Sequence, residues 1–248
     1  MAVVTGAGRG LGRAFSVIMA EAGADIAVVG RTRPALEQTA QELAEVGVRV
    51  LVHAIDVALP GAAEKVIRSA EAELGPVDIL VNNAGVLCLG AIETVNSDYW
   101  WHAFEVNLRA PMRWTQEVLT GMISRGRGLI INVSSAAANW TVPNASAYCA
   151  SKAALTRMTA ILDAEVRSRG VLSFAFSPRA ATDMTEELGT SSDFTEQQRQ
   201  MFKSASAVDV DGKLSRTVDL FRRVVSGELD HLSGRHLESE EPPPRASS

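Results

Sequence analysis

The sequence has few cysteines, no long hydrophobic run and no excess of positive charge. Its two cysteines, Cys88 and Cys149, form no Cys-x-x-Cys pair, so neither a disulfide framework nor a structural zinc site is indicated. No apolar run approaches the ~20 residues that span a bilayer, and an apolar segment follows Met1 at once, which leaves no room for a signal peptide. The formal net charge of −5 offers no basic excess for a phosphate backbone. These absences predict a cytoplasmic protein that binds neither nucleic acid nor a membrane.

The composition is that of an ordinary globular chain. Hydrophobic residues make up 46% of the 248 residues and charged residues 21%, which is enough to bury a core without metals or disulfides. The four histidines are scattered and form no ligand cluster, so no metal site is predicted. Residues 239–248 are polar and rich in proline, which predicts a disordered tail behind one domain of residues 1–238.

Short apolar segments alternate with segments of helical period along the chain. The apolar segments are rich in Val, Ile and Leu with little alternation, which is typical of strands covered on both faces of a parallel sheet. Repeated strand–helix–strand units predict an α/β fold, a doubly wound parallel sheet of about seven strands with helices on both faces. The expected strands are Ala2–Thr5, Asp25–Gly30, Val48–Ile55, Val77–Val81, Leu129–Val133, Val171–Phe176 and a short one near 234–237.

A glycine-rich turn follows the first expected strand and precedes a helix. It reads Thr5-Gly6-Ala7-Gly8-Arg9-Gly10-Leu11-Gly12. Small residues let the backbone approach a pyrophosphate, and the start of a helix offers free N–H groups. No Gly-x4-Gly-Lys-[Ser/Thr] run exists, which excludes a P-loop, and the Gly-x-Gly-x-x-Gly register from Gly8 meets Arg13 at its last position. Alone, the turn indicates either a dinucleotide site or a tight connection.

Four polar residues form a chemically suggestive set. Tyr148 and Lys152 lie four apart in an expected helix over 145–169, so their side chains share a face. A lysine ammonium beside a phenol lowers the pKa of the tyrosine, which can then exchange a proton with a substrate oxygen. Ser135 follows the fifth expected strand, where its hydroxyl could hold the same oxygen, and Asn107 is a poor residue for a helix interior. Taken singly, each residue could have a purely structural role, such as a surface position or a turn. The combination points to a catalytic site.

With these residues the sequence resembles the short-chain dehydrogenase/reductase family in its common single-domain form. The resemblance covers residues 1–184 strongly and 215–237 weakly, and it implies a Rossmann-type fold. It also implies an NAD(P)(H)-dependent enzyme, more often a reductase, that interconverts a ketone and a secondary alcohol. The matching residues are Thr5-Gly6-x3-Gly10-x-Gly12, Asp56, Asn82-Asn83-Ala84-Gly85, Asn107, Ser135 and Tyr148-x3-Lys152.

The resemblance implies a role for each matching residue. Tyr148 would be the general acid/base, and Lys152 would lower its pKa and bond the nicotinamide ribose. Ser135 would orient the substrate oxygen, and Asn107 would hold a water in the proton relay. Asp56 would meet the adenine amino group. The residues expected to bind the cofactor are Thr5, Gly6, Gly8, Arg9, Gly10, Leu11, Gly12, Arg31, Thr32, Asp56, Val57, Asn83, Ala84, Gly85, Tyr148, Lys152, Pro178 and Thr182.

The position that selects between the two dinucleotides carries no acid here. In such units an acidic residue at the end of the second strand bonds the adenosine 2′-hydroxyl and repels a 2′-phosphate. This position is Gly30, and no carboxylate occurs between Asp25 and Glu37, whereas Arg31 follows directly. A guanidinium matches a phosphate in charge and geometry. The sequence therefore predicts NADP(H) in preference to NAD(H); in the alternative, Arg31 only stacks on the adenine and both cofactors are accepted.

The sequence departs from the family in two informative places. The usual Pro-Gly is Pro178-Arg179, in a segment one residue short, and the final strand reads Ser-Gly-Arg-His-Leu-Glu over 233–238. Residues 185–214 are irregular and predict a lid at the ligand end of the sheet. The family usually pairs its helices across a two-fold axis, so a homodimer or homotetramer is expected from the helices near 98–125 and 145–169.

Three functions stay open at this point. The first is a ketone/alcohol oxidoreductase acting on a small-molecule carbonyl or alcohol of specialised metabolism, such as a sugar or a steroid. The second is a 3-oxoacyl-thioester reductase. The third is a non-catalytic dinucleotide-binding sensor or scaffold on the same fold, which the altered 178–182 loop supports and the intact Asn107, Ser135, Tyr148 and Lys152 oppose.

Overall fold

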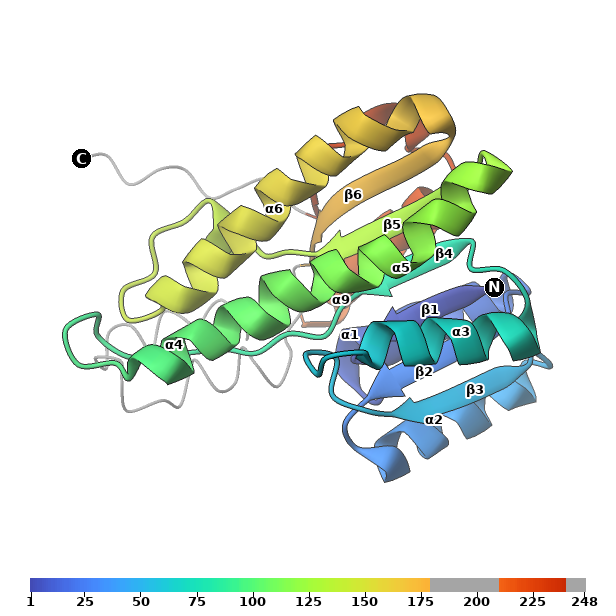
Figure 1. Ribbon diagram of the computed structural model, residues 1–248, viewed down its shortest axis with the longest axis horizontal. Coiled ribbons are helices and arrows are strands. Elements are labelled where there is room, and N and C mark those ends of the chain that lie inside the picture. The colour runs from blue at the N-terminus through green and yellow to red at the C-terminus, as the bar shows by residue number, and fades with distance from the viewer. Residues whose placement is uncertain (179–209, 240–248) are drawn as a thin grey trace.

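Seven parallel strands form one sheet at the centre of the part of the chain that the structure describes, which is residues 1–178 and 210–239 of a computed structural model (Figure 1). The strand order is β3-β2-β1-β4-β5-β6-β7, and every neighbouring pair is parallel. The predicted doubly wound sheet is confirmed. The strands are β1 Ala2–Thr5, β2 Ile26–Gly30, β3 Val50–Ala54, β4 Ile79–Asn82, β5 Gly128–Val133, β6 Val171–Ser177 and β7 His236–Glu238.

Helices cover both faces of the sheet, and each face has its own hydrophobic core. Alternate residues of one strand enter opposite cores: Val3 packs with α3, α5 and α6, whereas Val4 packs with α1, α2 and α9. Both strand faces are therefore apolar, which explains the continuous hydrophobic segments in the sequence. The helices are α1 Gly10–Glu21, α2 Arg33–Glu45, α3 Ala62–Leu74, α4 Ser97–Phe104, α5 Ala110–Arg125, α6 Ser146–Val166 and α9 Val210–Val225.

Three phenylalanines join the first and last helices to the sheet. The rings of Phe15 in α1 and Phe221 in α9 stack with their centroids 4.0 Å apart. Both meet the edge of Phe176 in β6, at 5.6 Å and 5.8 Å, in the edge-to-face geometry that aromatic pairs favour. Helix α9 is in this way part of the same core as α1 and β6.

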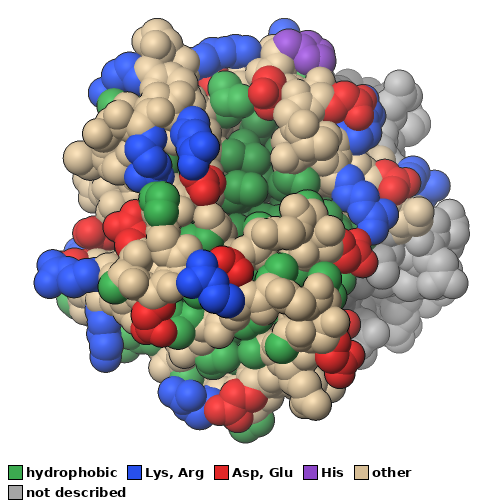
Figure 2. Space-filling view, turned by 90° about the vertical axis from the view of Figure 1, so that its right-hand side faces the viewer, with side chains coloured by type: hydrophobic (Ala, Val, Ile, Leu, Met, Phe, Trp, Pro, Cys, Tyr) green, Lys and Arg blue, Asp and Glu red, His purple; other side chains and the backbone are tan. Residues whose placement is uncertain are grey.

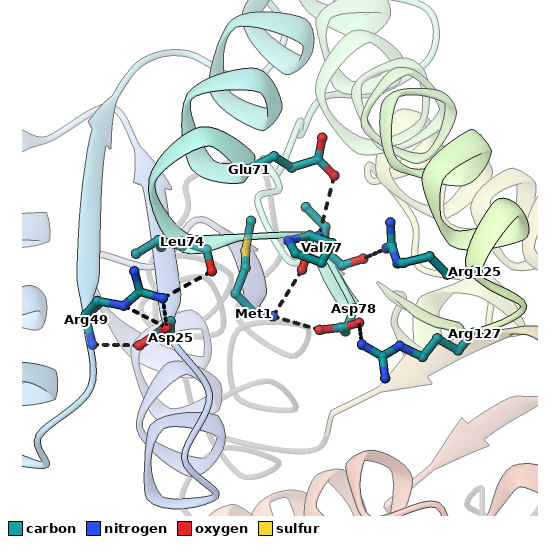
Figure 3. Close-up of polar contacts among 10 residues, drawn as sticks. Met1, Asp25, Arg49, Glu71, Leu74, Val77, Asp78, Arg125 and Arg127 are labelled. Atoms are coloured by element: carbon teal, nitrogen blue, oxygen red, sulfur yellow. Dashed lines mark hydrogen bonds and ion pairs between the residues drawn. The ribbon is translucent and has the colours of Figure 1, made fainter.

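Polar contacts close the sheet at the amino ends of its strands (Figure 3). Arg49 donates to the Asp25 carboxylate through Nη2 at 2.6 Å, through Nε at 3.0 Å and through its backbone N–H at 2.8 Å. These hydrogen bonds hold the pKa of the Asp25 carboxyl below its usual range. Arg127 pairs with Asp78 at 3.1 Å, and Arg125 donates to the carbonyl oxygen of Val77 at 2.6 Å. Figure 2 shows this face, where acidic and basic side chains are interspersed among hydrophobic ones.

Two expectations need correction in detail. The continuous helix expected near 98–125 is divided into α4, a π-helical turn over Glu105–Arg109 (η1) and α5. The irregular segment expected over 185–214 ends earlier, because α9 already begins at Val210. The rest of the predicted lid falls within residues 179–209, which lie outside the described residues.

Of the predicted tail only Ser239 is described, and its N–H donates to the Ser177 carbonyl oxygen at 3.4 Å. No helix among the described residues is long and apolar enough to cross a membrane.

Candidate active site

The predicted site residues gather at the carboxyl ends of the central strands. The glycine-rich turn follows β1, Asn83 follows β4 and Ser135 follows β5, and these three strands are neighbours in the sheet. The chain runs outward from β1 through β2 to β3 and then returns to place β4 on the other side of β1. Ligands of open α/β sheets bind at such a reversal of strand order. The topology therefore places the turn, Asn83 and Ser135 next to one another at the carboxyl edge of the sheet.

The glycine-rich turn is locked to the loop after β4. Gly6 has a φ of +67°, which favours glycine, and a Cβ on Gly12 would overlap the Gly6 carbonyl oxygen. Asn83 donates through Nδ2 to the carbonyl oxygens of Thr5 at 2.9 Å and Gly6 at 3.2 Å. Thr5 Oγ1 in turn accepts from the N–H groups of Asn83 and Ala84, each at 3.0 Å. These hydrogen bonds fix the glycine-rich turn and the loop after β4 relative to each other.

The start of α1 fits a pyrophosphate. Arg9 precedes the helix in extended conformation, and its side chain does not cap the first turn. Gly10 is exposed, and a Cβ there would meet nothing within 4 Å, so the approach is open. Uncapped N–H groups with the positive end of the helix dipole are suited to an anionic group. The start of α1 therefore offers free N–H groups at an open approach.

The carboxyl end of β2, where the sequence predicts contact with adenosine, carries positive charge. Arg31 and Thr32 are exposed directly after β2, and Arg31 forms no ion pair within the described ranges. The next arginine, Arg33, pairs instead with Glu37 at 3.5 Å. Arg31 is thus available for an anionic ligand.

Asp56 and Val57, which are also predicted to contact the adenosine, lie in the turn after β3. Asp56 Oδ1 accepts from the N–H of Ala58 at 2.9 Å, which fixes the turn after β3. The Val57 carbonyl oxygen accepts from Trp114 Nε1 at 3.1 Å. These contacts hold the backbone of the turn through a buried indole of α5.

Lys152 is buried beneath Tyr148. Its Nζ donates to the Val133 carbonyl oxygen at 2.7 Å and lies 5.9 Å from the centroid of the Tyr148 ring. Burial of the ammonium lowers the pKa of Lys152 to about 8. Burial also raises the pKa of Tyr148, and a hydrogen bond with Ser135 acts in the opposite direction. The lowering of the tyrosine pKa expected from Lys152 is not found in the protein alone, because desolvation of the phenol dominates.

Ser135 presents its hydroxyl from a tight turn. It caps a 3-10 helix over Ala136–Ala138 (η2), where its Oγ accepts from the Ala137 N–H at 3.2 Å. The same hydroxyl is hydrogen-bonded with Tyr148. Two hydroxyls from different elements therefore meet at the carboxyl edge of β5.

Asn107 lies in the π-helical turn η1 and is fully buried. Its Oδ1 accepts from the Val86 N–H at 2.9 Å, and its Nδ2 donates to the Val86 carbonyl oxygen at 2.9 Å and to Ser151 Oγ at 3.1 Å. Ser151 donates onward to the Tyr148 carbonyl oxygen at 2.8 Å. The sequence reasoning missed Ser151, although its place one residue before Lys152 puts it on the helix turn that carries the site.

Other predicted residues are placed less directly. A Cβ on Gly85 would lie 3.3 Å from Asn107 Oδ1 and 3.5 Å from Lys152 Nζ, so this glycine sits against the catalytic candidates. Gly8 packs against α2, and Leu11 is partly exposed in the first turn of α1. Pro178 directly follows β6 and is partly exposed. Thr182 lies outside the described residues. No cluster of metal-ligating side chains occurs in the ranges that the structure describes.

The buried ammonium predicts an unusual dependence of stability on pH. The pKa of Lys152 is about 8 in the folded protein and 10.5 as a reference value, so between these pH values the unfolded chain binds more protons. Stability should rise with pH across this window. Between pH 7.5 and pH 10.5, the free energy of unfolding of the native protein should rise by about 3 kcal/mol relative to that of Lys152→Met. Urea titrations of both proteins without cofactor measure it; a pH-independent difference would contradict the assigned burial.

Comparisons with known proteins agree with this geometry. The sequence model of the family described as short chain dehydrogenase matches residues 1–193. A short chain dehydrogenase from Pseudocercospora fijiensis is 42% identical over 249 residues, covering 96% of this chain and 79% of that protein.

Solved structures are similar over nearly the whole chain. A single-residue variant of actinorhodin polyketide ketoreductase with NADPH superposes with a TM-score of 0.86 at 27% identity, covering 96% of this chain and 94% of that one. An NAD+-bound xylitol dehydrogenase superposes with a TM-score of 0.85 at 23% identity, covering 96% of each chain, and shows the shared fold. Structures of this shape thus occur with either dinucleotide.

Proposed function

Since this chain belongs to the short-chain dehydrogenase/reductase family, we propose that it reduces a small-molecule ketone to a secondary alcohol with Tyr148, Lys152, Ser135 and Asn107 as its catalytic set. The chain is an oxidoreductase by its family; the residue roles are the proposal. The observation that carries it is the hydrogen bond between Ser135 and Tyr148, whose ring centroid lies 5.9 Å from the buried ammonium of Lys152.

The residues divide the work of one proton transfer. A bound nicotinamide supplies or accepts the hydride. The hydroxyls of Ser135 and Tyr148 hold the substrate oxygen from two sides, and Tyr148 gives it a proton during reduction. Lys152, whose pKa of about 8 leaves it mostly protonated at neutral pH, provides the positive charge that stabilises the phenolate left behind. Asn107 fixes the helix turn of Tyr148 through Ser151.

This function is tested by following the absorbance of the reduced cofactor at 340 nm with a panel of ketones and alcohols, each with NADP(H) and with NAD(H). We expect turnover with at least one ketone, and the panel includes a 3-oxoacyl thioester and polyol-derived ketones to separate the reductase subclasses. Dinucleotide binding with no turnover of any substrate would overturn the proposal and indicate the sensor or scaffold.

NADP(H) is the proposed cofactor because of Arg31. Its guanidinium stands exposed at the end of β2, where no carboxylate would repel a 2′-phosphate. We expect a preference for NADP(H) of about tenfold or more, since charged hydrogen bonds contribute roughly 1.5–3 kcal/mol. Arg31→Asp should weaken the Kd for NADPH by a similar factor and leave that for NADH unchanged or improved. Fluorescence titration measures the Kd for NADPH and for NADH. Arg68→Asp on α3, far from β2 in the sequence, is the control and should change neither Kd. A preference of the native protein for NADH would refute the role assigned to Arg31.

We also propose that the protein forms at least a homodimer in the cytoplasm. Met112 on α5 and Ile161 on α6 are exposed at 36% and 46%, which gives both helices apolar outer positions. Light scattering should give at least twice the chain mass of 26.4 kDa. A monodisperse monomer at micromolar concentration would contradict this proposal without affecting the catalytic one.

A further inference from the structure

A polar cluster on the edge strand β7 touches the turn that carries Ser135. His236 and Glu238 are two residues apart on β7, so their side chains leave the same face of the strand. Ser177 of β6 is paired in register with Glu238, and Asn139 directly follows η2. We call Asn139, Ser177, His236 and Glu238 the edge cluster. It joins the last strand of the sheet to the substrate side of the site.

The amide of Asn139 is held between the two side chains of β7. Its Nδ2 donates to Glu238 Oε1 at 3.3 Å and lies 3.2 Å from His236 Nδ1. An amide nitrogen only donates, so His236 accepts at Nδ1 and carries its proton at Nε2. The flipped amide would place its oxygen against the carboxylate. Electrostatics therefore favour the orientation in which Asn139 is anchored by both partners.

Asn139 also ends the turn that Ser135 begins. The Ala138 N–H donates to the Ser135 carbonyl oxygen at 3.0 Å, and the Asn139 N–H donates to the Ala136 carbonyl oxygen at 2.9 Å. A single 3-10 turn has poor hydrogen-bond geometry and little stability of its own. Since Ser135 Oγ is bonded to the Ala137 N–H within this turn, fixing its far end fixes the hydroxyl.

Several polar atoms of the edge cluster find no hydrogen-bond partner among the described residues. His236 Nε2, Glu238 Oε2 and Ser177 Oγ are buried and have no hydrogen-bond partner in the described structure. The side chains of His236 and Glu238 are only 13% and 15% exposed. Apolar side chains would cover this edge without leaving polar atoms unpaired. Local costs of this kind are expected where a position serves function.

We propose that Glu238, acting through Asn139, is a positioning residue for Ser135. The carboxylate holds the amide, the amide holds the end of η2, and η2 presents the Ser135 hydroxyl to the substrate oxygen. The proposal rests on the proposed function of Ser135. It gives the β7 end of the chain, which departs from the family pattern, a task in the reaction.

Steady-state kinetics on single and double variants test this chain of contacts. Glu238→Ala and Asn139→Ala should each lower kcat about fivefold, the effect of roughly one lost hydrogen bond, with the dinucleotide Kd unchanged. Ser135→Ala should lower kcat about a hundredfold. In the Ser135→Ala background, Glu238→Ala should cause no further loss, because the hydroxyl to be positioned is gone. Glu238→Gln keeps a side-chain oxygen for Asn139 and should restore most of kcat.

Matched controls separate positioning from damage to the fold. Glu228→Ala removes an exposed carboxylate that pairs with Arg223 at 2.7 Å and should leave kcat unchanged. Asn139→Asp changes an exposed side chain, so folding is kept, yet its carboxylate repels Glu238 and should reproduce the loss in kcat. Unchanged kcat in Glu238→Ala, Asn139→Ala and Asn139→Asp would overturn the positioning role alone. A full multiplicative loss from Glu238→Ala in the Ser135→Ala background would do the same. Full turnover of Ser135→Ala would instead overturn the proposed function of Ser135.

Discussion

Replacing Tyr148 by phenylalanine should lower kcat by roughly 10²- to 10⁴-fold, the range that a positioned acid or base contributes. The change removes one oxygen atom and keeps the ring over Lys152, so the surrounding packing is preserved. The phenol contributes a proton to the reaction and comparatively little to holding a dinucleotide in the glycine-rich crevice. The Kd for NADPH should therefore stay within about threefold of the native value. Stopped-flow kinetics and fluorescence titration measure the two quantities on the same preparations.

The chain provides its own matched control for this prediction. It has two tyrosines, and the second, Tyr99, donates to the Leu87 carbonyl oxygen at 3.3 Å from its place in α4. Tyr99→Phe removes the same atom from the same residue type outside the catalytic set, and kcat should change by less than about threefold. Near-native turnover of Tyr148→Phe would show that another group transfers the proton.

Lys152→Ala should damage both turnover and cofactor binding. The ammonium is the one charge assigned to the phenolate, so kcat should fall by about 10²-fold or more. It is also the proposed partner of the nicotinamide ribose, and losing a charged hydrogen bond should raise the Kd for NADPH about tenfold. This pattern differs from that of Tyr148→Phe, which affects kcat alone.

A different lysine separates this effect from a general loss of charge. Lys65 is exposed on α3, and Lys65→Ala should leave kcat and Kd unchanged. An unaltered Kd in Lys152→Ala would restrict Lys152 to the proton-transfer step and refute its ribose contact.

Much of this fold is predictable from local sequence, for a physical reason. Strands buried on both faces need long runs of Val, Ile and Leu, and β1 is found at the expected bounds of Ala2–Thr5. The glycine-rich turn was predictable because backbone crowding at Gly12 excludes a Cβ. The bounds of β3 are less exact, Val50–Ala54 against the expected Val48–Ile55, because burial of apolar side chains continues beyond the hydrogen-bonded ladder.

Long-range polar contacts were not predictable from local sequence. The π-helical turn at Asn107 depends on its hydrogen bonds with Val86, which lies in another loop. The raised pKa of Tyr148 depends on how far the folded chain shields the phenol from solvent. The contact between Asn139 and Glu238 joins residues 99 positions apart. Spacing on one helix identifies which side chains share a face, and only the tertiary structure decides which partner each one meets.

Deuterium transfer from the cofactor tests the central claim most directly. NADPH carrying deuterium at both C4 positions of the nicotinamide is incubated with the protein and a ketone that supports turnover, and the alcohol is analysed by mass spectrometry and NMR. The account predicts one deuterium on the carbinol carbon of the product and none from D₂O solvent at that carbon. Product without the label, or loss of label to water, would contradict direct hydride transfer at this site.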